Sequence, residues 1–197
     1  MIVLRKDKLK LVPSDDPILH NPPEEFDFAK EGVGMADRLF NLLCDRCKEI
    51  GGIGLAANQV GINTRVFVMG LDEIMFGIFN PVIVEYSDQL ENMDEGCLSF
   101  PGMSLNIKRP GSIVATYKDS KGKEFTNRFE GLSARVFQHE YDHMIGKTFK
   151  SHVSQLKWNL AVKKKNHVKQ KLVKKYSDKI LIDIYNEAKI AENRDLI

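Results

Sequence analysis

Apolar residues recur at helical spacing in one long stretch near the start of the chain. A polar, proline-containing segment, residues 13–25, precedes this stretch, and Gly51-Gly52 ends it. An apolar stripe that repeats every three to four residues is typical of a helix packed on one face against a core. We therefore predict a helix whose buried face carries Met35, Ala36, Leu39, Phe40, Leu43 and Cys47.

Shorter runs rich in β-branched and aromatic residues follow this helix, and they predict strands. The last two runs flank residues 119–122, Asp-Ser-Lys-Gly, a composition that favours a hairpin turn. A second helix is predicted from Leu132 to His143, because Leu132, Val136 and Phe137 fall on one face. The predicted strands are residues 65–69, 76–85, 105–108, 113–118 and 124–129.

The composition changes near Ser154. Residues 151–197 carry 11 Lys and Arg against 5 Asp and Glu, although the whole chain has a net charge of only +2. We predict a main domain, residues 1–150, and a basic helical extension, residues 151–197, with nine lysines from Lys157 to Lys179. The lysines form either the solvated face of a helix packed against the core or an RNA-binding surface. The apolar positions of this amphipathic helix are Leu156, Leu160, Val168, Leu172 and Tyr176.

Length and composition limit the classes of protein to which the chain can belong. A chain of 197 residues with 43% hydrophobic residues can bury one core. No apolar run approaches the roughly 20 residues of a transmembrane helix, and the short apolar start does not resemble a secretory signal. Three cysteines, an odd number, favour a reducing compartment over a disulfide framework. Cys44 and Cys47 form a C-x-x-C pair, which we interpret as core positions because no second pair completes a zinc site.

The strongest chemical signal is His139-Glu140-Tyr141-Asp142-His143. On a helix, His residues four apart lie one turn apart on one face, so both can bind the same metal ion. The intervening Glu140 can reach a water on that ion as a general base. This pattern predicts a metal-binding helix but does not name the reaction.

A catalytic site of this type needs a third protein ligand and an open position. The metzincin protease pattern would place its third His where this chain has Phe149, and His152 comes three residues too late. The thermolysin-like pattern needs a downstream helical Glu, and the first one is Glu187. Upstream, Cys97 offers a thiolate instead. A zinc endopeptidase with the His-Glu-x-x-His motif stays open as the alternative function.

Three motifs in fixed order identify the family that the chain resembles. They are Gly52-Ile53-Gly54-Leu55-Ala56-Ala57-Asn58-Gln59, then Glu95-Gly96-Cys97-Leu98-Ser99, then Gln138-His139-Glu140-Tyr141-Asp142-His143. In this order they are similar to the signature of peptide deformylase. The resemblance runs from about Asp16 to Phe149, which covers most of the chain.

The predicted strands around one ligand-bearing helix indicate an α+β fold, in which antiparallel strands surround a central metal-binding helix and the amphipathic helix lies at the C-terminus. The family resemblance implies that Cys97, His139 and His143 bind one divalent metal. Two imidazoles and a thiolate suit Fe²⁺, Zn²⁺ or Co²⁺ and also Ni²⁺, with Fe²⁺ expected natively. Glu140 would move the proton of the attacking water. The Gln59 amide and the Leu98 backbone N–H would stabilise the oxyanion.

The substrate implied by the resemblance is the N-terminal formylmethionine of nascent polypeptides, whose formyl group is released as formate. Arg109 and Asp142 are expected to form an ion pair that orients the metal helix. Arg135 is expected near the pocket, with its stem packed and its charged head in solvent. The methionine pocket is expected to be lined by Ile53, Gly54, Met93, Leu132, Val136 and His139.

Formylated starts occur in bacterial-type translation, which sets the expected location. We expect a cytoplasmic enzyme of a bacterium or of an organelle derived from one, without a cleaved presequence, and a bacteriophage origin stays open. Expected partners are the formylmethionyl peptide and, through the helix from Lys157 to Lys179, the ribosome or its rRNA. We expect neither DNA nor a membrane as a partner, and we expect a monomer.

Overall fold

The computed structural model describes residues 9–71 and 74–194. The chain divides into two compact units, Met1–Val153 and Ser154–Ile197. The first unit is α+β, with two antiparallel sheets and two α-helices. The second unit contains one α-helix. The fold class predicted from the sequence is therefore confirmed at the level of α+β with antiparallel strands.

The first helix, α1 (Phe28–Glu49), is the one that the apolar stripe predicted. Asp27 begins it, because its side chain accepts hydrogen bonds from the N–H groups of Ala29 and Lys30. Gly32, with φ of 76°, interrupts the helical backbone at the fifth residue of the helix. Its buried face includes Ala36, Leu39, Leu43, Cys44 and Cys47, so both cysteines of the C-x-x-C pair are core residues.

The larger sheet has five antiparallel strands in the order β1-β2-β3-β6-β7. The hairpin turn predicted at residues 119–122 is confirmed, since the Gly122 N–H donates to Asp119 O at 3.0 Å between the last two strands. Short 3-10 helices also occur in this unit, namely η1 (Pro17–Leu19), η2 (Ala57–Val60) and η3 (Phe149–His152). The strands are β1 (Gly54–Ala56), β2 (Val66–Leu71), β3 (Ile74–Tyr86), β6 (Ser112–Lys118) and β7 (Glu124–Glu130).

A separate two-stranded hairpin consists of β4 (Leu90–Gly96) and β5 (Ser104–Pro110). The sequence pattern predicts part of β5 but not β4, whose sequence LENMDEG has little apolar character. The three-residue strand β1 is likewise not predicted. In β4 the strand conformation depends on the antiparallel pairing with β5, which local sequence does not report.

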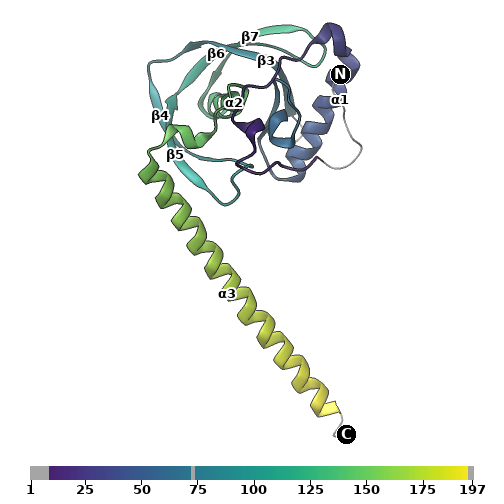
Figure 1. Ribbon diagram of the computed structural model, residues 1–197, viewed down its shortest axis with the longest axis vertical. Coiled ribbons are helices and arrows are strands. Elements are labelled where there is room, and N and C mark those ends of the chain that lie inside the picture. Colours follow the sequence, from purple (N-terminus) through teal and green to yellow (C-terminus); the bar gives the residue numbers. More distant parts are fainter. Residues whose placement is uncertain (1–8, 72–73, 195–197) are drawn as a thin grey trace. The chain divides into compact units, whose positions relative to one another are not determined.

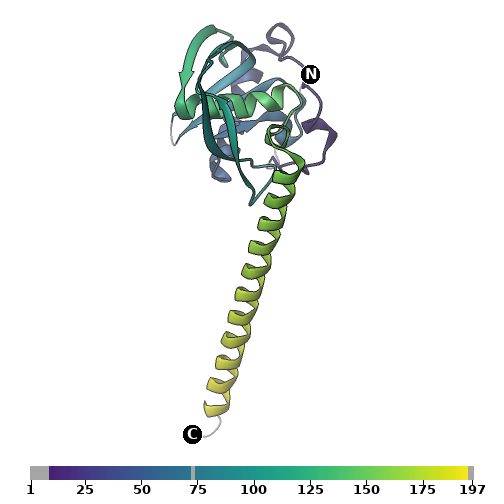
Figure 2. The ribbon, with the colours of Figure 1, turned by 90° about the vertical axis from the view of Figure 1, so that its left-hand side faces the viewer.

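The second helix, α2 (Gly131–Met144), is buried along most of its length. Figure 1 views it along its axis, with β3, β6 and β7 on one side and the β4–β5 hairpin on another, and Figure 2 shows it from the side. Phe137 lies fully buried and meets Phe67 edge-on, with ring centroids 5.1 Å apart. This packing fixes the helix that carries the His-Glu-x-x-His motif.

The unit Ser154–Ile197 is occupied by α3 (Gln155–Arg194), which confirms the predicted C-terminal helix. The Ser154 side chain accepts a hydrogen bond from the Lys157 N–H at the start of this helix. The side chains of Lys175, Tyr176 and Lys179, which the sequence analysis used, lie outside the described residues. Within the described part of the chain, none of the helices combines the length and apolar character that a membrane span requires.

Candidate metal centre and active site

Cys97, His139 and His143 come together inside the first unit. α2 supplies both histidines one turn apart, and Cys97 follows directly after β4. One donor atom from each residue lies within 4.8 Å of the other two, and all three residues are buried. Cys97 Sγ and His143 Nε2 are 3.6 Å apart. Local helix geometry places the imidazoles, whereas the β4–β5 hairpin places the thiol.

The chemistry of these donors fits a divalent transition metal. His139 Nδ1 donates to Glu95 Oε2 at 2.9 Å, which leaves Nε2 available to an ion. Soft sulfur with two imidazoles is a donor set that suits zinc or iron and disfavours magnesium or calcium. Three protein ligands also leave a position open for water or substrate. The residues therefore fit the metal that the motifs predicted.

The two imidazoles have opposite electrostatic environments. Burial disfavours the charged form of His139, but hydrogen bonds with Cys97 and Glu95 raise its pKa to about 10. Burial and the charge on His139 lower the pKa of His143 to about 3. A metal binds the neutral imidazole, so an ion in this site takes the place of the proton on His139.

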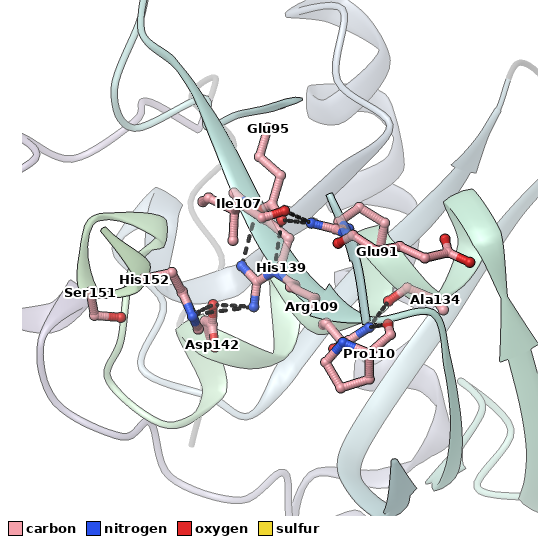
Figure 3. Close-up of polar contacts among 12 residues, drawn as sticks. Glu91, Glu95, Ile107, Arg109, Pro110, Ala134, His139, Asp142, Ser151 and His152 are labelled. Atoms are coloured by element: carbon pink, nitrogen blue, oxygen red, sulfur yellow. Dashed lines mark hydrogen bonds and ion pairs between the residues drawn. The ribbon is translucent and has the colours of Figure 1, made fainter. Parts of the chain in front are cut away.

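Glu95 joins three elements of the site, β4, β5 and α2, through one buried carboxylate (Figure 3). Arg109 Nε and Nη2 donate to its two oxygens at 2.7 and 2.9 Å, and Arg135 Nη1 donates at 2.8 Å. Burial opposes ionisation of Glu95, but the hydrogen bonds with His139, Arg109 and Arg135 hold its pKa well below its usual range. Glu95 is thus a charged anchor that fixes the His139 ring.

Arg109 also contacts the last turn of α2. Its Nη1 lies 2.8 Å from Asp142 Oδ2, so the residues predicted as an ion pair are in contact. His152 Nε2 lies 2.7 Å from the same Asp142 oxygen and 3.2 Å from Arg109 Nη1. Burial opposes ionisation of Asp142, but His152 and Arg109 lower its pKa. The guanidinium of Arg109 therefore bridges Glu95 on β4 and Asp142 on α2.

The expectation that the head of Arg135 reaches solvent is wrong. Arg135 is only 5% exposed. Its guanidinium donates to Ile107 O on β5 and to Glu91 O on β4, at 2.8 and 2.6 Å, besides Glu95. Two buried carbonyls and a carboxylate satisfy the guanidinium there in place of water. Arg135 thereby fastens α2 to the β4–β5 hairpin.

Glu140 lies beside the two histidines and is 4% exposed. Its Oε2 is buried and has no hydrogen-bond partner among the described residues. Burial raises the pKa of Glu140 to about 7, and the charge on His139 opposes this shift. Gly54 on β1 faces this side chain so closely that a Cβ on Gly54 would lie 2.5 Å from Glu140 Oε1. A carboxyl with a near-neutral pKa and a free oxygen is suited to proton transfer.

Gln59 on η2 is 1% exposed and reaches the same site. Its Oε1 accepts the Ala56 N–H at 2.8 Å. Its Nε2 donates to Ser99 Oγ at 3.1 Å and to Cys97 Sγ at 3.6 Å. In the sequence Ser99 stands out only as part of a motif, because its contact with Gln59 joins two segments 40 residues apart.

A cavity of about 400 Å³ opens onto these residues. The predicted pocket residues Ile53, Gly54, Leu132 and Val136 line it, as does Leu98. Met93 does not line it, although the sequence analysis placed it there. Arg135 contacts the backbone of Glu91 and of Ile107, the cross-strand partner of Met93, and so fills the space at this level of the hairpin. The complete lining is Gly51, Gly52, Ile53, Gly54, Gln59, Asp94, Glu95, Gly96, Cys97, Leu98, Leu132, Arg135, Val136, His139 and Glu140.

A model of the polypeptide deformylase family matches residues 8–159. The chain belongs to the polypeptide deformylase family. A peptide deformylase of Natranaerobius thermophilus is 41% identical over 145 residues, which covers 71% of this chain and 88% of that protein. Peptide deformylase 1B, chloroplastic/mitochondrial, of Arabidopsis thaliana is 38% identical over 149 residues, 72% of this chain but only 52% of that protein.

Solved structures agree with the sequence relatives. A peptide deformylase of Synechococcus elongatus, crystallised with actinonin, superposes with a TM-score of 0.73 at 34% identity. The superposition covers 84% of this chain and 93% of that one. The zinc endopeptidase alternative finds no support, because the family model, the relatives and the solved structure are all deformylases. The Cys97, His139 and His143 cluster of this deformylase-family chain is thus a candidate metal site in a family of metalloenzymes.

Proposed function

We propose that this chain is a metal-dependent hydrolase that removes the N-formyl group from formylmethionyl peptides and releases formate. The observation that carries the proposal is the Cys97, His139 and His143 cluster beside Glu140 at one cavity. The names of the relatives describe the same activity. In this proposal residues 1–150 are the catalytic part and residues 151–197 are an extension.

The three buried donors, Cys97 Sγ and the Nε2 atoms of His139 and His143, would hold the metal ion. A divalent ion bound there lowers the pKa of a water and polarises the formyl carbonyl. Glu95 supports this arrangement, because its hydrogen bond with Nδ1 fixes the His139 ring and leaves Nε2 free. Among metals that accept these donors, we propose Fe²⁺ as the native ion, with Zn²⁺, Co²⁺ and Ni²⁺ as substitutes.

Glu140 is proposed as the proton carrier. Its unpartnered Oε2 accepts the proton of the attacking water and then passes it to the leaving amine of methionine. The pKa of about 7 supports this role, because the carboxyl can both accept and release a proton near neutral pH. Arg109 and Asp142 are proposed to hold α2 in a fixed position against β4, and with it the Glu140 side chain.

Donors for the developing oxyanion are proposed to be the Gln59 amide and the Leu98 backbone N–H. Both residues line the cavity next to Cys97. A donor aimed at charge that develops in the transition state contributes about 3 kcal/mol. The methionine side chain is proposed to occupy the apolar part of the cavity, where Ile53, Leu132 and Val136 form its wall.

Formate release from a formyl-Met tripeptide by the purified chain tests the activity, with metal content measured under anaerobic conditions. Glu140→Ala should keep one equivalent of metal and lose at least about 10²-fold in kcat, as a lost acid–base group does. Cys97→Ala should lose the stoichiometric metal. Cleavage of an internal peptide bond without formate release would refute the proposal.

A second proposal concerns α3, which we propose binds ribosomal RNA. Nine lysines occur from Lys157 to Lys179, and a lysine-rich helix face attracts phosphates. This would bring the enzyme to the nascent chain in a bacterial cytoplasm, a bacteria-derived organelle or a phage-infected cell. Replacing Lys163, Lys164 and Lys165 by Gln should weaken co-sedimentation with ribosomes at low salt without a change in the turnover of free peptide. Equal co-sedimentation of both proteins would refute it.

A further inference from the structure

The backbone of β1 fixes the orientation of the Gln59 amide beside the metal ligands. The Ala56 N–H donates to Oε1 at 2.8 Å. If the amide were flipped, two N–H groups would face each other at Ala56, and the carbonyl oxygen would face the Cys97 sulfur. Both contacts would be repulsive in a buried site. The backbone of β1 therefore directs the NH₂ group toward Ser99 and Cys97.

Ser99 determines where the two hydrogens of this NH₂ group point. Ser99 Oγ lies 3.1 Å from Gln59 Nε2 and accepts one of them. The second hydrogen then points to Cys97 Sγ, at 3.6 Å, an acceptable distance for a donor to sulfur. Gln59, Cys97 and Ser99 are all less than 10% exposed, so water competes little for these hydrogens.

We propose that Ser99 is a positioning residue that orients the Gln59 amide so that it donates an N–H···S hydrogen bond to the Cys97 ligand. This inference rests on the proposed function, in which Cys97 binds the metal. A thiolate that binds a metal donates charge to it, and a hydrogen bond on sulfur withdraws part of that charge. A metal held here would then be the stronger Lewis acid while the substrate carbonyl binds, before the amide turns to the oxyanion. Ser99 acts only through Gln59.

The arrangement also gives Gln59 two uses for one hydrogen. In the resting site the second N–H faces Cys97 Sγ, and in the transition state the same amide is proposed to face the oxyanion. A small rotation of the amide within the 3.1 Å contact to Ser99 would connect the two positions. Loss of the Ser99 hydroxyl removes the contact about which the amide rotates and leaves a buried N–H of Gln59 without its acceptor.

The test uses the full-length chain loaded with Co²⁺, because the sulfur-to-cobalt charge-transfer band reports the donor strength of the thiolate directly. A hydrogen bond on sulfur lowers the energy of its lone pairs, so its loss moves the band to longer wavelength. We expect this shift in Gln59→Leu and in Ser99→Ala, and we expect Ser99→Thr, which keeps the hydroxyl, to restore the band. The double variant should match Gln59→Leu alone, because Ser99 acts through Gln59.

Kinetics of formate release supply the second readout. Ser99→Ala should lower kcat by about 10- to 100-fold with KM nearly unchanged, the range seen for residues that support metal ligands. Ser87→Ala removes a serine hydroxyl that accepts the Ser112 N–H elsewhere, and it should leave the charge-transfer band and the rate unchanged.

A band shift in Gln59→Leu but not in Ser99→Ala would overturn the role of Ser99. Unshifted bands in both would overturn the N–H···S bond, and a wild-type chain that binds Co²⁺ but releases no formate would refute the proposed function instead.

Discussion

Gly54→Ala tests whether the position of Glu140 controls turnover. A Cβ built on Gly54 would lie 2.5 Å from Oε1 of Glu140 and 3.0 Å from its Cδ and Cγ. Gly54 does not have a positive φ, so alanine fits the backbone, and the three atoms nearest to the added Cβ all belong to the Glu140 side chain. The substitution thus adds one methyl group against the proposed proton carrier and removes no hydrogen bond.

The size of the effect follows from the contact distance. Ordinary contacts of a Cβ begin near 3.4 Å, so the carboxyl has to retreat from 2.5 Å to that distance. This is a displacement of roughly 1 Å, and a misplacement of about 1 Å of a catalytic group can cost on the order of 10²-fold in rate. We expect kcat for formate release to fall by about this factor. The metal content should not change, because Cys97, His139 and His143 keep their positions.

The assay separates this effect from a loss of substrate binding. If Gly54 acts through Glu140, kcat falls and KM changes little, whereas a blocked methionine pocket would raise KM. Gly34→Ala is the matched control, because a Cβ on Gly34 of α1 meets no atom within 4 Å. A Gly54→Ala enzyme with wild-type kcat would refute the reasoning, and so would one that has lost its metal.

Three further predictions concern stability and metal affinity. Phe137→Ala should lower the free energy of unfolding by about 3–5 kcal/mol in urea titrations, because it empties a fully buried ring site. Glu95→Gln should weaken metal binding by about 10- to 100-fold in chelator competition, since it removes the charge that fixes His139. Asp94→Asn, an exposed carboxylate on the same strand, is its control. Burial raises the pKa of Cys44 to about 11 and of Cys47 to about 12, so both thiols should resist alkylation at pH 8 until the chain unfolds.

The direction of the cysteine effect with pH follows from the raised pKa values. Since the folded state holds both thiols neutral, their contribution to stability is complete below the ordinary thiol pKa of 9.0. It is lost as the pH rises from there through about 11 and 12. A Cys44→Ala and Cys47→Ala double variant should lose less stability than the parent over this range. An equal loss in both proteins would contradict the assignment, as would rapid alkylation of the folded chain at pH 8.

Elements with a strong periodic signal were predictable from the sequence, and elements that depend on distant partners were not. The helix α1 and the β6–β7 hairpin follow from local patterns, namely an apolar stripe and the turn Asp-Ser-Lys-Gly. The strand β4 carries Glu91, Asp94 and Glu95 and looks like a loop by composition. It is a strand because β5 pairs with it along its whole length and because Arg135 binds its backbone and its carboxylate. No window of local sequence contains that information.

The same distinction applies to the site. The spacing of His139 and His143 requires only a helix, so their proximity could be derived from sequence, and the placement of Cys97 came from motif resemblance. Ser99 and Glu95 belong to a motif that the sequence shows. Their contacts with Gln59 and His139 could not be predicted, because these depend on the fold. Arg135 was misjudged because long basic side chains usually extend to solvent. Its partners, the carbonyls of Glu91 and Ile107, belong to the backbone of a hairpin that sequence patterns described poorly.

The buried charges connect the metal ligands with the wall of the pocket, so that a change in one affects the other. Glu95 receives hydrogen bonds from the two arginines while it holds His139, and Arg135 also lines the cavity. Removing either arginine would leave the Glu95 charge partly uncompensated in a buried site, a larger cost than the loss of one surface ion pair. A substitution at Arg135 intended to reshape the pocket would therefore also disturb the orientation of His139. Substrate specificity and metal affinity cannot be varied independently at this position, because one carboxylate serves both.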